Sequence, residues 1–142
     1  DAHPEYGFDI HDNVSVTMGH KTEVQPDICA RQTQGDDADT CIIKDGILHG
    51  APSLIIEVAN TSTTLDLGWR KDDYEKAGVR EYVVYRSLDR AVDWFELKDS
   101  RFVPIAPNAD GSLESRRYPG LVFPASLIGA PSQGPTSPLR SR

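Results

Sequence analysis

Two acidic residues of this chain stand at the ends of predicted strands. Glu57 is the one charged residue in the apolar run 53–59, and Asp27 follows a proline at the head of a shorter strand. A carboxylate on a buried strand is costly unless it is paired or bound to a metal ion. Two acids on adjacent strand ends form an oxygen-rich site of the kind that magnesium prefers. Asp27 and Glu57 are therefore candidate ligands of one divalent ion.

The same acids also have structural interpretations, which the pattern alone leaves open. Glu57 could form an ion pair with Arg70, Lys71 or Arg31, because a buried carboxylate and a nearby cation offset each other's charge. Asp27 could cap a turn after the proline, as aspartate often does. Taken singly, each acid fits its structural role at least as well as metal binding.

A helix predicted over residues 66–77 supplies the cations that face these acids. Arg70 and Lys71 lie three and four residues after Leu67, so both straddle the helix side that carries the apolar residues. Either cation can reach toward the preceding strand, and the alternative is a solvated pair that extends past the core. Trp69 points roughly the opposite way, which indicates an exposed aromatic or a contact outside this chain.

Strand patterns surround this helix. The segment 53–59 has the continuous apolar pattern of a central strand that is covered on both faces. Candidate N-caps at 61–64 precede the helix, and Gly78 is placed to end it. The polar stretch 32–50 reads as a surface loop. Shorter or alternating patterns predict further strands over 14–18, 26–31, 81–86, 91–97, 101–106 and 113–116.

Composition sets the class of protein. A chain of 142 residues with 38% hydrophobic and 26% charged residues fits one globular domain, expected over residues 1–128 and followed by a disordered tail over 129–142. No apolar run approaches the roughly 20 residues that cross a bilayer, so we expect a cytoplasmic protein that does not contact membranes. Cys29 and Cys41 are expected to be reduced, and no zinc-binding spacing is present.

The charge is unevenly distributed. The formal net charge is −7, and residues 1–50 hold ten acids against three bases, so the remaining 92 residues are formally neutral. An acidic balance argues mildly against a dedicated nucleic-acid-binding module, since phosphates are held mainly by clustered Lys and Arg. A locally basic surface is still compatible with the neutral part of the chain.

Several short motifs occur in an order that resembles the Uma-two family of restriction endonucleases, in the PD-(D/E)xK nuclease superfamily. The resemblance covers roughly residues 24–123. The central strand resembles the family's P-x-L-x-x-E-V, and the helix and next strand resemble D-x-x-x-K-x-x-x-Y-x-x-x-G-V-x-E-Y. The matching segments are the "PD" element at 25–28, then 50–59, 66–68, 74–84 and the closing "PGL" at 119–121.

The resemblance implies an α/β fold of the restriction-endonuclease type: a mixed sheet flanked by a helix, with a C-terminal strand meander. It also implies that Asp27 and Glu57 are the two metal-binding acids, with the carbonyl of Val58 as a further ligand and Mg²⁺ or Mn²⁺ as the cofactor. Family members usually carry an N-terminal helix and hairpin before the "PD" strand, so the N-terminal part of the domain is expected to be truncated here.

The chain departs from the family at its lysine. The superfamily usually has lysine two residues after the glutamate, where this chain has Ala59, and the Uma-two type carries it on the helix, four residues before the tyrosine. Four residues before Tyr74 stands Arg70, and the lysine is displaced to Lys71. Arginine stays charged and holds phosphate well, but it does not replace a lysine that eases deprotonation of water.

Two functions follow as expectations. The first is a magnesium-dependent endonuclease that hydrolyses DNA phosphodiester bonds, with Asp27, Glu57, Arg70 and Lys71 as candidate catalytic residues. The alternative is a nuclease-fold domain without activity that acts as an interaction or nucleic-acid-binding module. DNA is the expected partner, and the exposed Trp69 together with an open sheet edge makes a homodimer a candidate assembly.

Overall fold

The main sheet of the computed structural model has seven strands. The structure describes residues 2–3, 7–18, 22–35, 38–59 and 66–128, so the predicted N-caps at 61–64 and the predicted tail lie outside the described residues. In spatial order the strands are β1 (Ala2–His3), β2 (Phe8–Asp12), β5 (Ile28–Gln32), β8 (Leu54–Ala59), β9 (Glu81–Arg86), β10 (Ala91–Lys98) and β11 (Arg101–Pro104).

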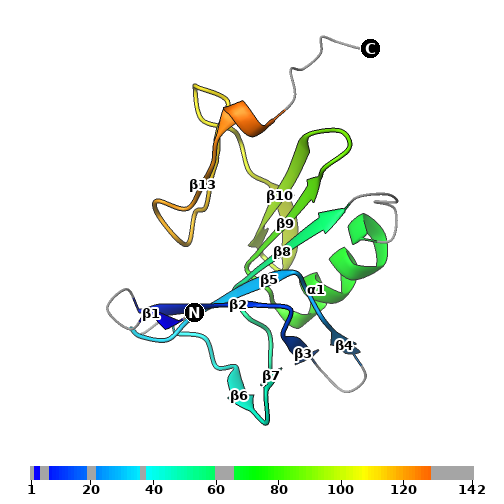
Figure 1. Cartoon of the computed structure of the whole chain (residues 1–142), viewed down its shortest axis with the longest axis vertical. Coiled ribbons are helices and arrows are strands. Elements are labelled where there is room, and N and C mark those ends of the chain that lie inside the picture. The colour runs from blue at the N-terminus through cyan, green and yellow to red at the C-terminus, as the bar shows by residue number, and fades with distance from the viewer. Residues whose placement is uncertain (1, 4–6, 19–21, 36–37, 60–65, 129–142) are drawn as a thin grey trace.

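This sheet is mixed, as the sequence predicts. The neighbours β8 and β9 run parallel, and every other pair in the sheet is antiparallel. Parallel neighbours need a crossover connection, and the segment between β8 and β9 contains the predicted helix. Three of the strands predicted after this crossover, β9 to β11, form a meander in this sheet (Figure 1), whereas the strand predicted over 113–116 pairs outside it.

The crossover helix begins with a wider turn than the sequence predicts. Its first turn is the π-helix η2 (Asp66–Arg70), and α1 (Lys71–Ala77) continues from it. Gly78 ends the helix at φ 90°, and its backbone N–H bonds to the carbonyls of Tyr74 and Glu75. The predicted stop at Gly78 is therefore confirmed, because glycine adopts this left-handed conformation without a Cβ penalty.

None of the described helices is long and apolar enough to span a membrane.

The stretch 32–50 is not the surface loop that the sequence predicts. It contributes β6 (Ile42–Lys44) and β7 (Ile47–His49) to a second sheet, together with β3 (Ser15–Met18) and β4 (Thr22–Val24). Asp45 and Gly46 connect β6 to β7 with φ 54° and 76°. An Asp-Gly pair with two positive φ angles is the favoured two-residue hairpin turn, and we overlooked this signal because three-residue strands show no clear alternation.

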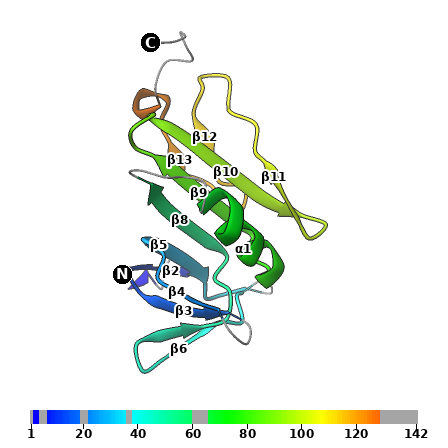
Figure 2. The ribbon, with the colours of Figure 1, turned by 90° about the vertical axis from the view of Figure 1, so that its right-hand side faces the viewer.

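Two hydrophobic clusters pack on opposite faces of the main sheet. One face meets α1 and the second sheet, and its buried residues include Cys29, Ile55, Tyr74 and Tyr82. The other face meets a C-terminal segment that holds β12 (Leu113–Glu114), β13 (Val122–Phe123) and the short helix η3 (Ala125–Leu127). Figure 2 shows α1 in front of the sheet, and Figure 1 shows the C-terminal segment on the opposite side. The period-two pattern of β8 thus divides its side chains between two separate cores.

Both cysteines lie in the interior as free thiols. Burial raises the pKa of the Cys29 thiol to about 12 and that of the Cys41 thiol to about 11. The reactive form of cysteine is the thiolate, so both side chains are held in their inert form at neutral pH. They serve as small apolar groups of the core beside the second sheet.

Candidate active site

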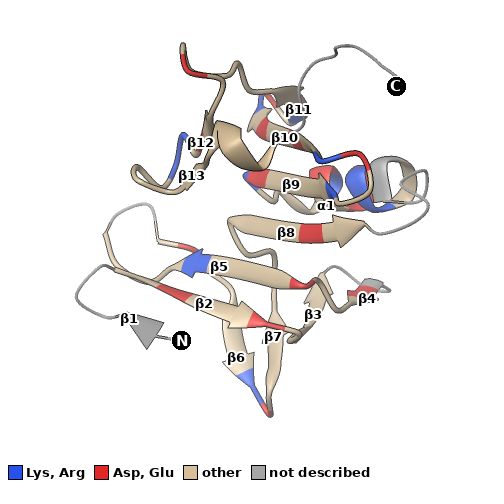
Figure 3. Ribbon diagram, turned by 45° about the horizontal axis from the view of Figure 1, so that its top comes forward, with Lys and Arg blue, Asp and Glu red and all other residues tan. Residues whose placement is uncertain are grey.

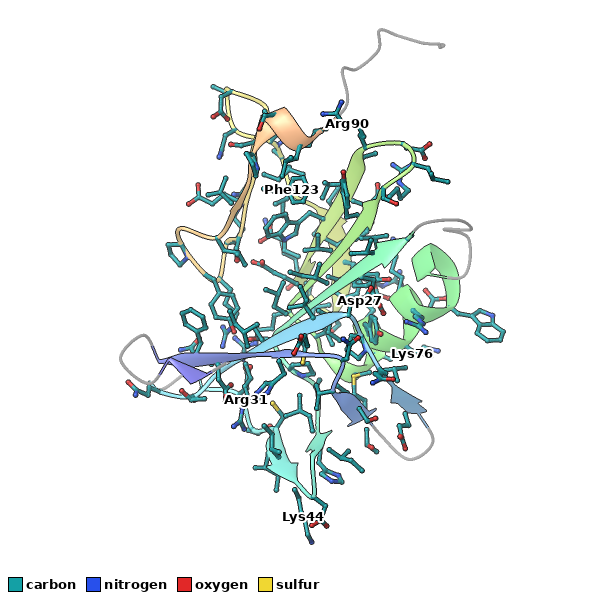
Figure 4. The ribbon with its side chains drawn as sticks, viewed as in Figure 1. Asp27, Arg31, Lys44, Lys76, Arg90 and Phe123 are labelled. Carbon is teal, nitrogen blue, oxygen red and sulfur yellow. The ribbon has the colours of Figure 1, made fainter. Side chains whose placement is uncertain are left out.

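The strand pairing brings Asp27 and Glu57 together. β5 pairs antiparallel with β8, with Ile28 opposite Ile56, and the same register continued by one residue sets Asp27 opposite Glu57. Directly opposed residues of an antiparallel pair carry their side chains on the same face, with Cβ atoms about 5 Å apart. Figure 3 shows β5 beside β8 in the sheet, and Figure 4 shows Asp27 at the end of β5 that is nearer to α1.

Glu57 is held by two donors from the helix. Its side chain is only 4% exposed, and its Oε2 accepts a 2.6 Å bond from Nη1 of Arg70 and a 2.9 Å bond from the hydroxyl of Tyr74. Burial, followed by the charge of Glu57, raises the pKa of Tyr74, so its hydroxyl stays protonated and can only donate to the carboxylate. These two bonds satisfy a buried charge that would otherwise be costly.

Asp27 is fixed by the backbone of the neighbouring strand. Its Oδ2 accepts a 2.7 Å bond from the backbone N–H of Val58, and its side chain is half-buried. This bond ties the head of β5 to the end of β8, directly beside Glu57. Asp27 therefore has a structural contact of the kind expected for a turn aspartate, on the residue that follows Glu57.

The donor set fits a small magnesium site. Among the described residues no group of three or more His, Cys, Asp or Glu gathers around one point. Magnesium, however, is usually bound through one or two carboxylates, with water and substrate phosphate completing its shell. Asp27, Glu57 and the Val58 carbonyl are oxygen donors of that type, on two hydrogen-bonded strands.

The two candidate cations separate in space. Arg70 turns toward Glu57, with its side chain 39% exposed and its guanidinium between the carboxylate and solvent. Lys71 turns toward the sheet, where its Nζ lies 4.3 Å from the ring centroid of Phe95 in a cation–π contact. Of the two cations, Arg70 is the one that the structure brings to the acids.

A family comparison fits this arrangement. The sequence profile of the Uma2 family, described as "Putative restriction endonuclease", matches residues 2–126. This chain belongs to the Uma2 family. Its fold is also similar to the crystal structure of "a putative nuclease belonging to DUF820" from Anabaena variabilis, with 14% identity and a TM-score of 0.60 over 80% of this chain. The chain spans 63% of the length of that protein. The search of curated proteins returned no significant match.

The Uma2 motif residue Tyr74 is one contact that we did not anticipate from the sequence. The residue pattern by itself does not assign Tyr74 a contact with Glu57. Its spacing was the available signal, since Arg70 and Tyr74 are four residues apart and such residues project on one side of a helix. The structure shows that both contact the same carboxylate oxygen.

The same face carries a second ion pair, between Asp93 and Arg86, that the sequence did not predict. Asp93 of β10 lies opposite Val84, which in turn lies beside Glu57 on β9 and β8. Two strand spacings put Asp93 roughly 10 Å from the Glu57 position along this row. Its carboxylate accepts a 2.7 Å bond from Nε of Arg86, and Asp89 accepts a 3.2 Å bond from the same guanidinium. At this separation Asp93 is too far from Glu57 to act as a third ligand of the same metal ion.

Another buried acid, Glu81, has a structural role on the opposite face. Its side chain is about 1% exposed, and its two carboxylate oxygens accept four hydrogen bonds. The donors belong to β10 and to the C-terminal segment: Trp94 Nε1, Ser115 Oγ and the backbone N–H groups of Arg116 and Arg117. Burial alone therefore does not identify an acidic residue of this fold as catalytic.

A large apolar cavity also lies on the face away from Glu57. It has a volume of about 960 Å³ between the strands β2, β5 and β8 and the loop 117–121. The sheet residues that line it include Ile10, Ala30, Leu54 and Ile56, which belong to the core cluster beneath the C-terminal segment. The sheet separates this cavity from the paired acids, so it is not part of the candidate active site.

Proposed function

We propose that this chain is a metal-dependent endonuclease that hydrolyses phosphodiester bonds of DNA. The observation that carries the proposal is the 2.7 Å bond from the backbone N–H of Val58 to Asp27, which ties Asp27 to the residue after Glu57, together with the bond from Arg70 to Glu57. The family description and the name of the similar crystal structure support the same class of activity. Both acids stand at one end of the sheet, where strand ends commonly present functional groups.

Each residue has a distinct task in this proposal. Asp27, Glu57 and the Val58 carbonyl would hold the ion, Mg²⁺ or Mn²⁺, which when bound activates water and offsets charge on the scissile phosphate. The Tyr74 hydroxyl fixes the orientation of the Glu57 carboxylate by donating to its Oε2. Arg70 extends from Glu57 toward solvent, where its guanidinium can stabilise the charge that develops on the phosphate.

The dependence on the metal ion tests the proposal. We expect the protein to cleave plasmid DNA in magnesium or manganese and to show no cleavage above background in EDTA, measured by the conversion of supercoiled to nicked and linear forms. Restoring magnesium after EDTA should restore the cleavage. Equal cleavage with and without the metal would contradict the proposal, because the bound ion is the group that activates water in it.

The separation of Arg70 and Lys71 predicts different effects of their substitution. Arg70→Ala should lower the cleavage rate by about 100-fold, because it removes the cation that faces the phosphate. Arg70→Lys should keep more activity than Arg70→Ala, since lysine is the family residue at this position. Lys71→Ala should change the rate by less than about 3-fold, because its Nζ contacts Phe95. If Lys71→Ala lowered the rate as much as Arg70→Ala, our assignment of the cation would be wrong.

One observation favours a second candidate, an inactive nuclease-fold module that binds nucleic acid. Arginine stands where the family has lysine, and its 2.6 Å bond neutralises the carboxylate that would hold the ion. Arginine also does not release a proton near neutral pH, so it cannot assist deprotonation of water as lysine can. Calorimetry with magnesium separates the two functions: the endonuclease must bind the ion, whereas the module need not.

A further inference from the structure

An exposed tryptophan lies next to the candidate active site. Trp69 is 73% exposed, whereas the other tryptophan, Trp94, is 5% exposed and donates to a buried carboxylate. Tryptophan is the largest apolar side chain and is enriched at interfaces. Trp69 immediately precedes Arg70, the residue that contacts Glu57. Nothing in the function proposed above uses it.

The local backbone explains why Trp69 and Arg70 diverge. Both residues belong to the π-helical turn η2. Such turns are rare in proteins overall, and many of those that occur lie at functional sites. Arg70 sends its side chain inward to Glu57, and Trp69 is left on the solvent side. The turn therefore exposes an indole on the residue next to the arginine that bonds to Glu57.

The charge of the chain indicates what the indole would bind. With a net charge of −7 and two carboxylates at the site, the protein offers little electrostatic attraction to the dense phosphates of a duplex. Stacking of a base on an aromatic ring is independent of protein charge and changes affinity roughly 5- to 150-fold per base. The ring needs an open base face, which an unpaired nucleotide presents and an intact duplex hides.

We propose that Trp69 stacks on an unpaired base close to the scissile phosphate, so that the preferred substrate is single-stranded or locally unpaired DNA. This inference rests on the proposed DNA endonuclease function and specifies its substrate class. Arg70 contacts the phosphate side of the strand, and Trp69 contacts a base of the same strand a few nucleotides away. Selectivity then comes from strand accessibility and not from the identity of base pairs.

Binding of a fluorescently labelled thymidine oligonucleotide, measured by anisotropy without magnesium, tests the stacking contact. We expect the wild-type chain to bind this strand more tightly than a blunt duplex of equal length. Trp69→Ala should weaken single-strand binding at least about 5-fold, and Trp69→Phe should keep most of it, because phenylalanine also offers a ring face. Leu88→Ala is the matched control, since Leu88 is 77% exposed in the turn between β9 and β10 and should have no effect.

The outcomes separate this inference from the endonuclease function. Unchanged single-strand binding by Trp69→Ala, tighter binding of the duplex, or no binding of the single strand by the wild type would each overturn the stacking contact. None of these results bears on whether plasmid DNA is cut in magnesium. Conversely, a Trp69-dependent single-strand affinity in a protein that never cleaves would support the contact and refute the endonuclease. Equal melting temperatures of wild type and Trp69→Ala would show that the fold is intact.

Discussion

Replacing Glu57 with glutamine should lower the rate of DNA cleavage by at least about 1,000-fold, because it removes the negative charge from one of the two acids that we propose as metal ligands. Glutamine keeps the shape of the side chain and an oxygen that can accept the bond from Tyr74. The variant should therefore fold. The loss would be measured as initial rates of plasmid nicking in magnesium, at equal concentrations of folded protein.

The other buried glutamate provides the matched control for this substitution. Glu81→Gln makes the same chemical change, at a side chain that is also almost fully buried but lies on the opposite face of the sheet. At a temperature where both variants are folded, Glu81→Gln should cleave at close to the wild-type rate. Similar losses in both variants would attribute the effect to general damage to the fold. Wild-type cleavage by Glu57→Gln would remove Glu57 from the site.

Replacing Glu81 with alanine should lower the free energy of unfolding by about 4 kcal/mol, a large part of the stability of a domain of this size. The substitution removes the acceptor of four donors, from the Trp94 and Ser115 side chains and from the backbone N–H groups of Arg116 and Arg117. A buried donor left without an acceptor costs about 1 to 3 kcal/mol, less where water enters the cavity. Urea unfolding followed by circular dichroism would measure the change.

A control variant and a proteolysis experiment test whether Glu81 anchors the C-terminal segment. Glu23→Ala is the control, since Glu23 is exposed and its substitution should change the free energy of unfolding by less than about 0.5 kcal/mol. The C-terminal segment should also detach first, so limited proteolysis of Glu81→Ala should cut between β11 and β12 faster than in the wild type. A loss below about 1 kcal/mol would mean that Glu81 does not anchor this segment.

The two buried glutamates of the parallel pair β8 and β9 face opposite sides of the sheet and have different partners. Glu57 and Glu81 stand on neighbouring strands, β8 and β9, and each is the acid of an apolar strand. Glu57 faces the helix, whose cation and hydroxyl orient it while Arg70 stays in contact with solvent. Glu81 faces the C-terminal segment and has its two oxygens filled by donors of the protein. Both acids are buried, and they differ in their partners: Glu57 bonds to an arginine that is partly exposed to solvent, whereas Glu81 accepts hydrogen bonds from β10 and the C-terminal segment.

The sequence by itself determined the elements that carry local signals. The apolar run of β8, the bounds of β9 and the helix stop at Gly78 were all predicted, because side-chain periodicity and glycine's tolerance of positive φ act within a few residues. The ordered motifs likewise predicted the family, and with it the mixed sheet. Asp27 and Glu57 could be named as a pair, although their roles stay predictions.

Only the tertiary structure decided which groups meet. The sequence leaves both cations on the same side of the helix, and only the structure shows that Arg70 contacts Glu57 while Lys71 contacts Phe95. The four donors to Glu81 come from residues 13 to 36 positions away, which no local pattern connects. Strand register and the path of the chain fix such contacts, because pairing between distant segments follows from the packing of the whole sheet and not from the residues on either side.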